Sequence, residues 1–228
     1  MDFKIMNIYA FYEPINEPWI DHTDQNALIN LWIKSWSYYG WTPIIYGIKE
    51  CENCEGYEEL YNVCQKLPTV NPKKYETYCF IRWLYMAKIG GWYADMDMIN
   101  YGFLPVDYGD KTVTTGVKLH CSSIHMSSIN YKKIVDAIKN FKLSDKDYYD
   151  FNNDGTKTPH VSDMSVLSSY GQIDIALDIL KEYPYGGHTT STIVHYPFSC
   201  MKSVDINITR TQIILKDKRT VKFYDNQN

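Results

Sequence analysis

The segment from residue 72 to residue 99 constrains the fold of this chain most, because a helix, a pair of glycines and a strand follow one another there. Asn71 is a candidate N-cap, and Pro72 stands in the first helical turn, where proline is favoured. Gly90 is a natural terminator at the other end. These signals predict a helix over 72–89, and the apolar run after the glycines predicts a short strand.

Helix and strand patterns alternate along the first half of the chain. The sequence predicts strands over 5–11 and 41–46 and helices over 25–39 and 57–66. This alternation predicts an α/β fold with a parallel, doubly wound central sheet. Ligands of such sheets bind beyond the carboxyl ends of the strands, so Phe11 and Tyr12 are candidate ligand-binding residues.

Beyond residue 110 the pattern becomes mixed. It predicts, in chain order, a strand over 112–118, a helix over 130–141, a polar loop over 144–161, helices over 163–182, and strands over 192–196, 211–215 and 220–224. No convincing linker and no internal repeat divides the sequence. We therefore expect one domain over residues 1–228, which is long enough to bury a hydrophobic core.

Two carboxylates, Asp95 and Asp97, end the strand that follows the glycines. Residues i and i+2 of an extended chain share a face, so both side chains are expected to project together. Mg²⁺ and Mn²⁺ are commonly held by one or two carboxylates together with substrate phosphates. The pair therefore predicts a clamp for a metal-bound diphosphate, and the alternative is a solvated turn after a strand.

Arg82 stands near the middle of the inward face predicted for the helix over 72–89. That face comprises Tyr75, Tyr78, Cys79, Arg82, Tyr85, Met86 and Ile89. A guanidinium on an apolar face needs a partner, either the aspartates or a phosphate that it grips through two nitrogens. The alternative is a structural bridge from Arg82 to an aspartate, with no ligand.

The run Arg82-x-x-x-Met86-x-x-x-Gly90-Gly91-x-Tyr93-x-Asp95-x-Asp97 resembles the signature of D-x-D glycosyltransferases of the GT-A fold. The resemblance is to the group of fungal α-mannosyltransferases, bacterial capsule and lipopolysaccharide sugar transferases and clostridial glucosylating toxins. It covers about residues 75 to 100, with fainter similarity in the first strand and helix and in His195-x-x-x-Ser199.

The resemblance implies a Rossmann-like, mostly parallel central sheet with flanking helices and a small mixed α/β portion at the C-terminus. The nucleotide-binding half would span about residues 1–110, and the acceptor and lid half about 111–228. It also implies a metal-dependent enzyme that moves a sugar from a nucleoside diphosphate sugar, most simply a UDP-sugar, to a hydroxyl of a glycan or protein, with retention of configuration. Small enzymes of this type occur in large DNA viruses and bacteria.

Roles for individual residues follow from the same resemblance. Asp97 would be a direct ligand of Mn²⁺ or Mg²⁺, and Asp95 would reach the ribose, the sugar or the metal as a catalytic and donor-binding residue. Arg82 would fasten the donor. Asp163 would present a catalytic carboxylate toward the donor sugar or the acceptor, and His195 would contact the metal or a phosphate. Cap-only and core roles remain open for Asp163 and His195, and His188 is a weaker alternative to His195.

The chain departs from the family pattern at two places. Tyr78 and Cys79 replace a Ser-Asp pair whose carboxylate binds sugar hydroxyls, which predicts a donor with a less polar edge, such as a 6-deoxy sugar. Cys200 replaces the tryptophan that usually follows Ser199, so the lid over the diphosphate is expected to be built differently.

Two other classes of function compete with a transferase. A module that binds a sugar nucleotide or polysaccharide without turnover would also suit the 21 tyrosines and 6 tryptophans. A D-x-D phosphatase would carry its nucleophilic aspartate on the first strand, whereas Asp95 occurs in mid-chain. The net charge of −4 and a pI near 5.9 argue against nucleic acid as a partner, because such proteins carry basic patches.

Several shorter patterns complete the sequence-based picture. No apolar run approaches about 18 residues and no secretory h-region opens the chain, so we expect no transmembrane segment and a cytoplasmic protein, in the host cytoplasm if it is viral. Cys51-x-x-Cys54 lacks a second pair for zinc and is expected in a surface loop. Residues 150–155 copy half of a calcium loop, but Val161 stands where its glutamate belongs, so an Asx-rich turn is favoured. The sequon at Asn207 is read as chance.

Overall fold

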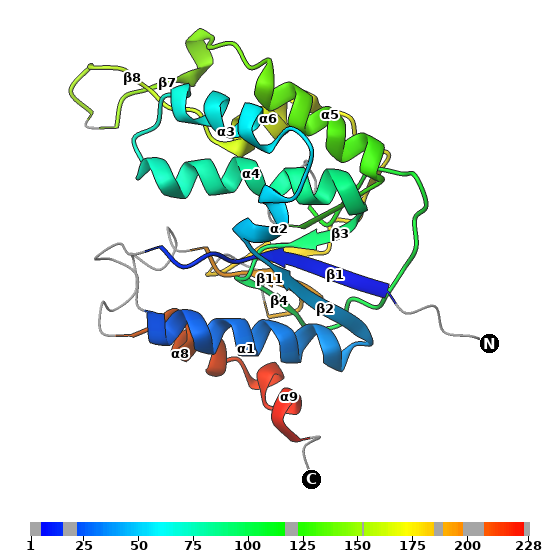
Figure 1. The fold of residues 1–228 in the computed structure, drawn as a ribbon. Helices are drawn as coiled ribbons and strands as arrows, with labels where there is room; N and C mark the ends of the chain where they lie inside the picture. Colours follow the sequence, from blue (N-terminus) through cyan, green and yellow to red (C-terminus); the bar gives the residue numbers. More distant parts are fainter. Residues whose placement is uncertain are drawn as a thin grey trace.

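The computed structural model describes residues 6–15, 22–116, 123–151, 153–184, 189–197 and 208–225. A six-stranded sheet lies between two groups of helices (Figure 1). Its strands stand in the order β2 (Trp41–Tyr46), β1 (Met6–Phe11), β3 (Gly91–Ala94), β6 (Ser123–Met126), β5 (Val113–Thr114) and β9 (Ile175–Ala176). The predicted α/β class is therefore confirmed, and both halves of the chain contribute strands to one sheet.

The sheet is mixed. β1 runs parallel to β2 and β3, and β5 runs parallel to β9, but β6 is antiparallel to both of its neighbours. Because β1 and β3 are parallel and Tyr9 pairs with Tyr93, the ends of both strands lie at the same edge. Phe11 and Asp95, each two residues beyond that pair, therefore belong to the same edge of the sheet.

A second sheet of three strands begins immediately after the first. β4 (Met98–Asn100) pairs antiparallel with β11 (Ile193–His195), which pairs parallel with β10 (Leu180–Glu182). Only residues 95–97 separate β3 from β4, so the turn that carries both aspartates connects the two sheets. A separate hairpin consists of β7 (Tyr148–Tyr149) and β8 (Thr158–Pro159).

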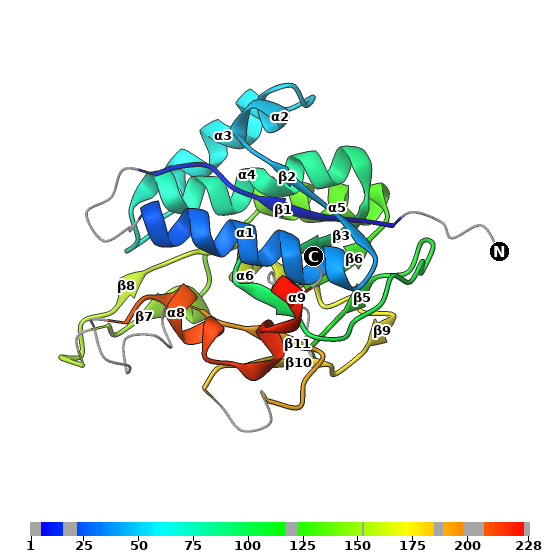
Figure 2. The ribbon, with the colours of Figure 1, turned by 90° about the horizontal axis from the view of Figure 1, so that it is seen from below.

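Helices cover both faces of the central sheet, as Figures 1 and 2 show. One group contains α1 (His22–Tyr38), α8 (Arg210–Leu215) and α9 (Lys222–Asp225). The other contains α2 (Ile48–Glu52), α3 (Tyr57–Lys66), α4 (Lys73–Ile89), α5 (Ser128–Lys139) and α6 (Asp163–Tyr170). Short 3-10 turns occur at Asp145–Asp147 and Lys218–Thr220.

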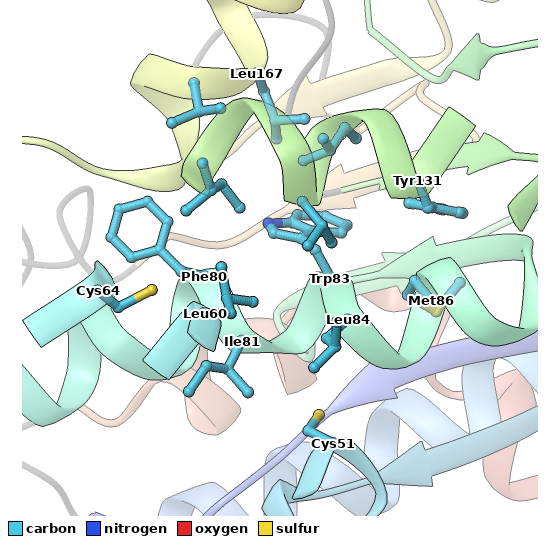
Figure 3. Packing of buried hydrophobic residues seen from close by; sticks show 14 of the residues in the cluster. Cys51, Leu60, Cys64, Phe80, Ile81, Trp83, Leu84, Met86, Tyr131 and Leu167 are labelled. Atoms are coloured by element: carbon cyan, nitrogen blue, oxygen red, sulfur yellow. The ribbon is translucent and has the colours of Figure 1, made fainter. Parts of the chain in front are cut away.

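Helix α4 is the structural centre of the second group. Trp83 stacks on Tyr131 of α5 with ring centroids 5.9 Å apart, and Phe80 and Leu167 fill the same apolar cluster (Figure 3). Each large apolar side chain buried in this way stabilises the fold by about 1.5–3 kcal/mol. The single inward stripe predicted for this helix is only partly correct. Buried residues surround most of the helix, and Tyr75 is 39% exposed, because α3, α5 and the sheet pack against different sides of it.

The two glycines after α4 are needed for different reasons. Gly90 has φ 69° and Gly91 has φ 98°, a region that favours glycine. A Cβ on Gly90 would lie 2.9 Å from the backbone nitrogen of Ser128, whereas a Cβ on Gly91 would meet only the ring of Tyr9 at 3.8 Å. The pair therefore turns the chain from α4 into β3 in close contact with the start of α5.

Four sequence predictions of secondary structure are wrong. The strand predicted over 211–215 lies in α8, and the strand predicted over 220–224 spans the end of the 3-10 turn at Lys218–Thr220 and most of α9. The helical segment predicted over 163–182 ends at Tyr170, because Gly171 adopts a left-handed conformation, and β9 and β10 follow. The charged loop around Cys51 contains α2, in which Cys51 is fully buried.

Candidate functional site

The two aspartates lie in a tight turn rather than at an extended strand end. The backbone N–H of Met98 donates to the carbonyl of Asp95 at 3.0 Å, which closes the turn over residues 95–97. The backbone at this turn is therefore not the extended one on which the common projection of the two carboxylates was predicted. Each carboxylate contacts its own cluster of charged side chains, and the charge of Asp97 still acts on Asp95, whose pKa it raises.

Arg82 joins the first cluster. Its Nη1 lies 2.6 Å from Oδ1 of Asp95, and its Nη2 lies 2.5 Å from Oδ2 of Asp163. Tyr93 adds a third group, since Nη1 of Arg82 donates to its hydroxyl at 2.9 Å and that hydroxyl donates to Asp95 at 2.7 Å. The partner predicted for Arg82 among the aspartates is present, and one guanidinium connects the end of β3 to the start of α6.

Asp163 occupies the first turn of α6, but it does not cap the helix. Ser162 is the N-cap residue, with Ser165 in the reciprocal position. The Asp163 carboxylate accepts instead from Arg82 and, at 3.1 Å, from Nε1 of the Trp83 indole. The sequence left open whether Asp163 caps α6 or serves the site. Ser162 is the N-cap, and the Asp163 carboxylate faces Arg82.

Asp97 forms the second cluster. Its Oδ2 accepts from Nη1 of Arg210 at 3.0 Å, and its Oδ1 lies 3.4 Å from Nε2 of His195. The other nitrogen of His195, Nδ1, lies 3.3 Å from Oε1 of Glu182. Strand pairing explains the arrangement, because His195 pairs with Met98 on one side and with Glu182 on the other.

Burial and charge control the protonation of the two clusters. Burial alone would lower the pKa of His195, but Asp97 and Glu182 raise it to about 10. Burial by itself would raise the pKa of Asp97, but His195 and Arg210 lower it overall. Burial raises the pKa of Asp95 despite the attraction of Arg82, and the negative charge of Asp97 adds to that rise. Asp97 is thus held ionised, and His195 is a cation at neutral pH.

The residues fit a divalent ion that arrives with a phosphate ligand. Among the described residues, no group of three or more His, Cys, Asp or Glu side chains could hold a metal by itself. One or two carboxylates suffice for Mg²⁺ when substrate phosphates supply further oxygens. In the described part of the chain, Oδ2 of Asp95 accepts no hydrogen bond, and the side chain is 20% exposed. This oxygen is available to a ligand without disrupting an existing contact.

The remaining predicted site residues lie around these clusters. The ring of Phe11 packs edge-on against Tyr78, one turn before Arg82 on α4, with centroids 5.9 Å apart. Tyr12 packs instead with the cluster on the α1 side of the sheet. His188, Ser199, Cys200 and Asn207 lie outside the described residues.

Sequence reasoning missed Arg210 and Glu182 as members of the site. Arg210 contacts Asp97 although the two residues are 113 positions apart in the chain, so no local sequence pattern predicts the contact. The Thr209 and Gln212 capping box could have revealed the helix on which Arg210 stands. Trp83 and Tyr93 were visible as aromatic neighbours of the motif, but their hydrogen bonds depend on the packing of α4 against β3.

The other candidate motifs serve local structure. Cys51 and Cys54 are buried beneath α4 rather than placed in a surface loop, and burial raises the pKa of both thiols. The carboxylate of Asp150 accepts from the backbone N–H groups of Asp154 and Gly155, so the segment after β7 is the expected Asx-rich turn. Among the described residues, no helix combines the length and the apolar character needed to cross a membrane.

Comparison with protein-family models, with curated proteins and with solved structures finds no match for this chain.

Proposed function

We propose that this protein is a metal-dependent glycosyltransferase of the GT-A type, which transfers a sugar from a nucleoside diphosphate sugar, most simply a UDP-sugar, to a hydroxyl of a glycan or protein. The observation that carries the proposal is the paired arrangement at the turn 95–97. Two carboxylates at the carboxyl edge of a sheet stand beside three cationic side chains, Arg82, His195 and Arg210.

The charges of the site suit a diphosphate with a divalent ion. Arg82, His195 and Arg210 are cationic partners for phosphate oxygens, and Arg side chains can grip phosphate through two nitrogens. Asp95 and Asp97 would repel a bare diphosphate, so a cation is needed between them. The edge formed by the carboxyl ends of the strands in an α/β sheet is also where such ligands bind.

Asp95, through its available oxygen, and Asp97 would hold Mn²⁺ or Mg²⁺ at this turn. When bound, the ion neutralises the charge that develops on the departing diphosphate. A role of His195 as a metal ligand would require loss of its proton and of its ion pair with Asp97, because a ligand nitrogen must be unprotonated. We therefore assign His195 first to the diphosphate, as a cation.

The two remaining acids have different roles. Arg82 holds Asp95 toward the sugar or ribose and connects it to Asp163. Asp163 is 4% exposed and faces the same guanidinium, so it orients the site or contacts the transferred sugar. Cys79, partly buried one turn before Arg82, leaves this side of the site without the family's carboxylate, which favours a 6-deoxy donor sugar.

The first experiment measures nucleotide binding by thermal shift, since a ligand that binds only the native state raises apparent stability. UDP, GDP and dTDP are compared with and without Mn²⁺. We expect one nucleotide to raise the unfolding midpoint only when Mn²⁺ is present, and Asp97→Asn to remove that shift while it keeps the wild-type fold by circular dichroism. A nucleotide shift that persists in EDTA, or in Asp97→Asn, contradicts the metal assignment.

A binding module without turnover is the second candidate, and one observation favours it. Both oxygens of Asp97 are already engaged by Arg210 and His195, so the turn is electrostatically satisfied without a metal. Release of free UDP from UDP-sugars separates the candidates. A transferase hydrolyses its donor slowly in the absence of acceptor, whereas a module binds the donor and releases no UDP.

A further inference from the structure

A cavity of about 610 Å³ lies outside the charged clusters, between α2, α3 and the first half of α4. Its lining includes three tyrosines, two carboxylates and two lysines, namely Tyr57, Tyr61, Tyr78, Glu52, Glu58, Lys73 and Lys74. None of these residues belongs to the Arg82 or Asp97 cluster. The cavity is large enough for a small organic ligand.

The tyrosines give the cavity flat apolar walls with polar edges. Tyr57 and Tyr61 stand one turn apart on α3, with ring centroids 5.9 Å apart and planes inclined by 31°. Burial and nearby carboxylates raise the pKa of Tyr57 to about 12, so its hydroxyl remains a hydrogen-bond donor at neutral pH. Rings of this kind offer both an apolar face and a hydroxyl to a ligand.

The charges around the tyrosines balance. Glu52 and Glu58 are exposed acids, and Lys73 and Lys74 are the bases on the α4 side. Lys73 is already bound to the carbonyl of Leu67, and Lys74 lies 5.6 Å from the centroid of the Tyr78 ring. A lining with no net charge, many hydroxyl and carboxylate groups and flat rings favours a neutral, hydroxyl-rich ligand over a phosphate or a nucleotide.

The cavity also adjoins the candidate site. Tyr78 lines the cavity and stands one turn before Arg82 on α4, and its ring contacts Phe11 at the end of β1. A ligand in the cavity therefore lies next to the sheet edge where the donor is proposed to bind, separated from it by Phe11 and Tyr78.

We infer that this cavity binds a ring of a neutral saccharide, and, on the proposed function, that this saccharide is part of the acceptor glycan. The tyrosine rings of α3 would pack against the sugar face, while Glu52 and Glu58 would accept hydrogen bonds from sugar hydroxyls at its rim and the Gln65 amide would donate or accept them.

The test uses the full chain and ligand-observed NMR with neutral disaccharides (maltose, lactose and cellobiose), with glucuronic acid and uridine as charged and nucleoside comparators. We expect at least one neutral disaccharide to bind and Tyr61→Ala to weaken it about tenfold, the loss of a ring contact worth roughly 1.4 kcal/mol. Tyr148→Ala, on the exposed hairpin, is the matched control and should leave binding unchanged. Absence of saccharide binding, equal binding by Tyr61→Ala, or competition by uridine overturns the inference.

A second variant covers the case in which Tyr61→Ala does not fold. Glu52 and Glu58 are exposed, so the double change Glu52→Gln and Glu58→Gln should fold and make the lining basic. We expect this variant to gain several-fold affinity for glucuronic acid, and no gain contradicts the inference. Nucleotide binding with Mn²⁺ is measured on the same samples. Its loss in Asp97→Asn without loss of saccharide binding separates the acceptor cavity from the donor site, so each proposal can fail alone.

Discussion

Arg82 is the residue on which the first cluster depends. It is 7% exposed and serves two carboxylates through two different nitrogens, a geometry that a lysine ammonium cannot reproduce. Arg82→Met would leave Asp95 and Asp163 without their cation, which we expect to cost about 3–5 kcal/mol in the free energy of unfolding. Arg82→Lys should cost less but still weaken nucleotide binding. Urea denaturation and nucleotide thermal shift measure the two effects.

The control for Arg82 is Arg219, which pairs with Asp217 at 2.6 Å and lies outside both clusters. Arg219→Met should destabilise the protein without changing the nucleotide shift measured at matched stability. If Arg82→Lys keeps the wild-type nucleotide shift, Arg82 is a structural bridge only, which is the alternative that the sequence left open.

Glu76 predicts a specific pH dependence of stability. Its side chain is 4% exposed, Oε1 accepts from Asn71 at 2.7 Å, and burial raises the pKa of the carboxyl to about 7. Because the folded state then binds the proton more tightly than the unfolded chain, the stability contributed by Glu76 is full below about pH 4.5 and is lost as the pH rises through about 7.

Glu76→Gln removes that titration and keeps the size of the side chain. We expect the variant to gain stability relative to the wild type by about 3 kcal/mol between about pH 4 and about pH 8, since each unit of pKa shift corresponds to about 1.4 kcal/mol. Urea unfolding of both proteins across this range measures the difference. Curves that stay parallel at every pH contradict the buried, proton-binding state of Glu76.

Individual site residues were predictable only where a local sequence pattern indicated them. The position of Arg82 on the inner face of a helix predicted Asp95 and Asp97, or a phosphate, as its partners. Asp95 is one of its partners, but the second carboxylate is that of Asp163. The turn at residues 95–97 was not predicted, because the period-two pattern of the two aspartates indicated an extended chain there. The sequence did not predict a role for Arg210, because its contact with Asp97 depends on the positions of the second sheet and α8.

The connection from α4 to β3 is the element whose geometry matters most for the site. At Gly90, alanine would combine a positive φ with a 2.9 Å approach to the backbone of Ser128. A positive φ alone costs a residue with a Cβ roughly 1–2 kcal/mol. We therefore expect Gly90→Ala to lose more unfolding free energy than Gly91→Ala, and to weaken nucleotide binding by shifting β3.

Gly155 provides the matched control for these variants. Its φ is 84°, and nothing lies within 4 Å of the Cβ that alanine would add, so Gly155→Ala carries the backbone strain alone. Urea denaturation of the three alanine variants should rank Gly90 as the most costly. Equal losses at Gly90 and Gly155 would show that the contact with Ser128 relaxes without cost.

At the scale of elements, the first half of the chain was largely predictable and the second only in part, since α5, β5 and β11 were predicted but α8, α9, β9 and β10 were not. Between Met6 and Ile89, apolar periodicity and terminal glycines predicted the strands and the longer helices to within a few residues. In α8, Ile213 and Ile214 suggest a strand, but packing against α1 and the cap at Thr209 favour a helix. β9 exists because it pairs with β5, a long-range contact that a local pattern does not contain.

On the scale of the whole molecule, the turn 95–97 is one of the connections between the two sheets, and the short segment between β9 and β10 is another. β3 belongs to the six-stranded sheet and β4 to the three-stranded one, and each aspartate is held by residues of its own side. Arg82 and Asp163 bring α4 and α6 to the turn, while His195 and Arg210 bring β11 and α8. A ligand that contacts both carboxylates therefore contacts both parts of the fold.

Hydrogen exchange tests this coupling directly, because local opening governs how fast a backbone amide exchanges. We expect UDP with Mn²⁺, or whichever nucleotide the thermal shift selects, to slow exchange at residues 91–100 and also at 193–195, with no slowing when Mn²⁺ is replaced by EDTA. The hairpin formed by β7 and β8 serves as the internal control, since neither strand contributes to the clusters. Protection confined to the segment around β3 would place the ligand on the Arg82 side alone and remove Asp97 and His195 from the site.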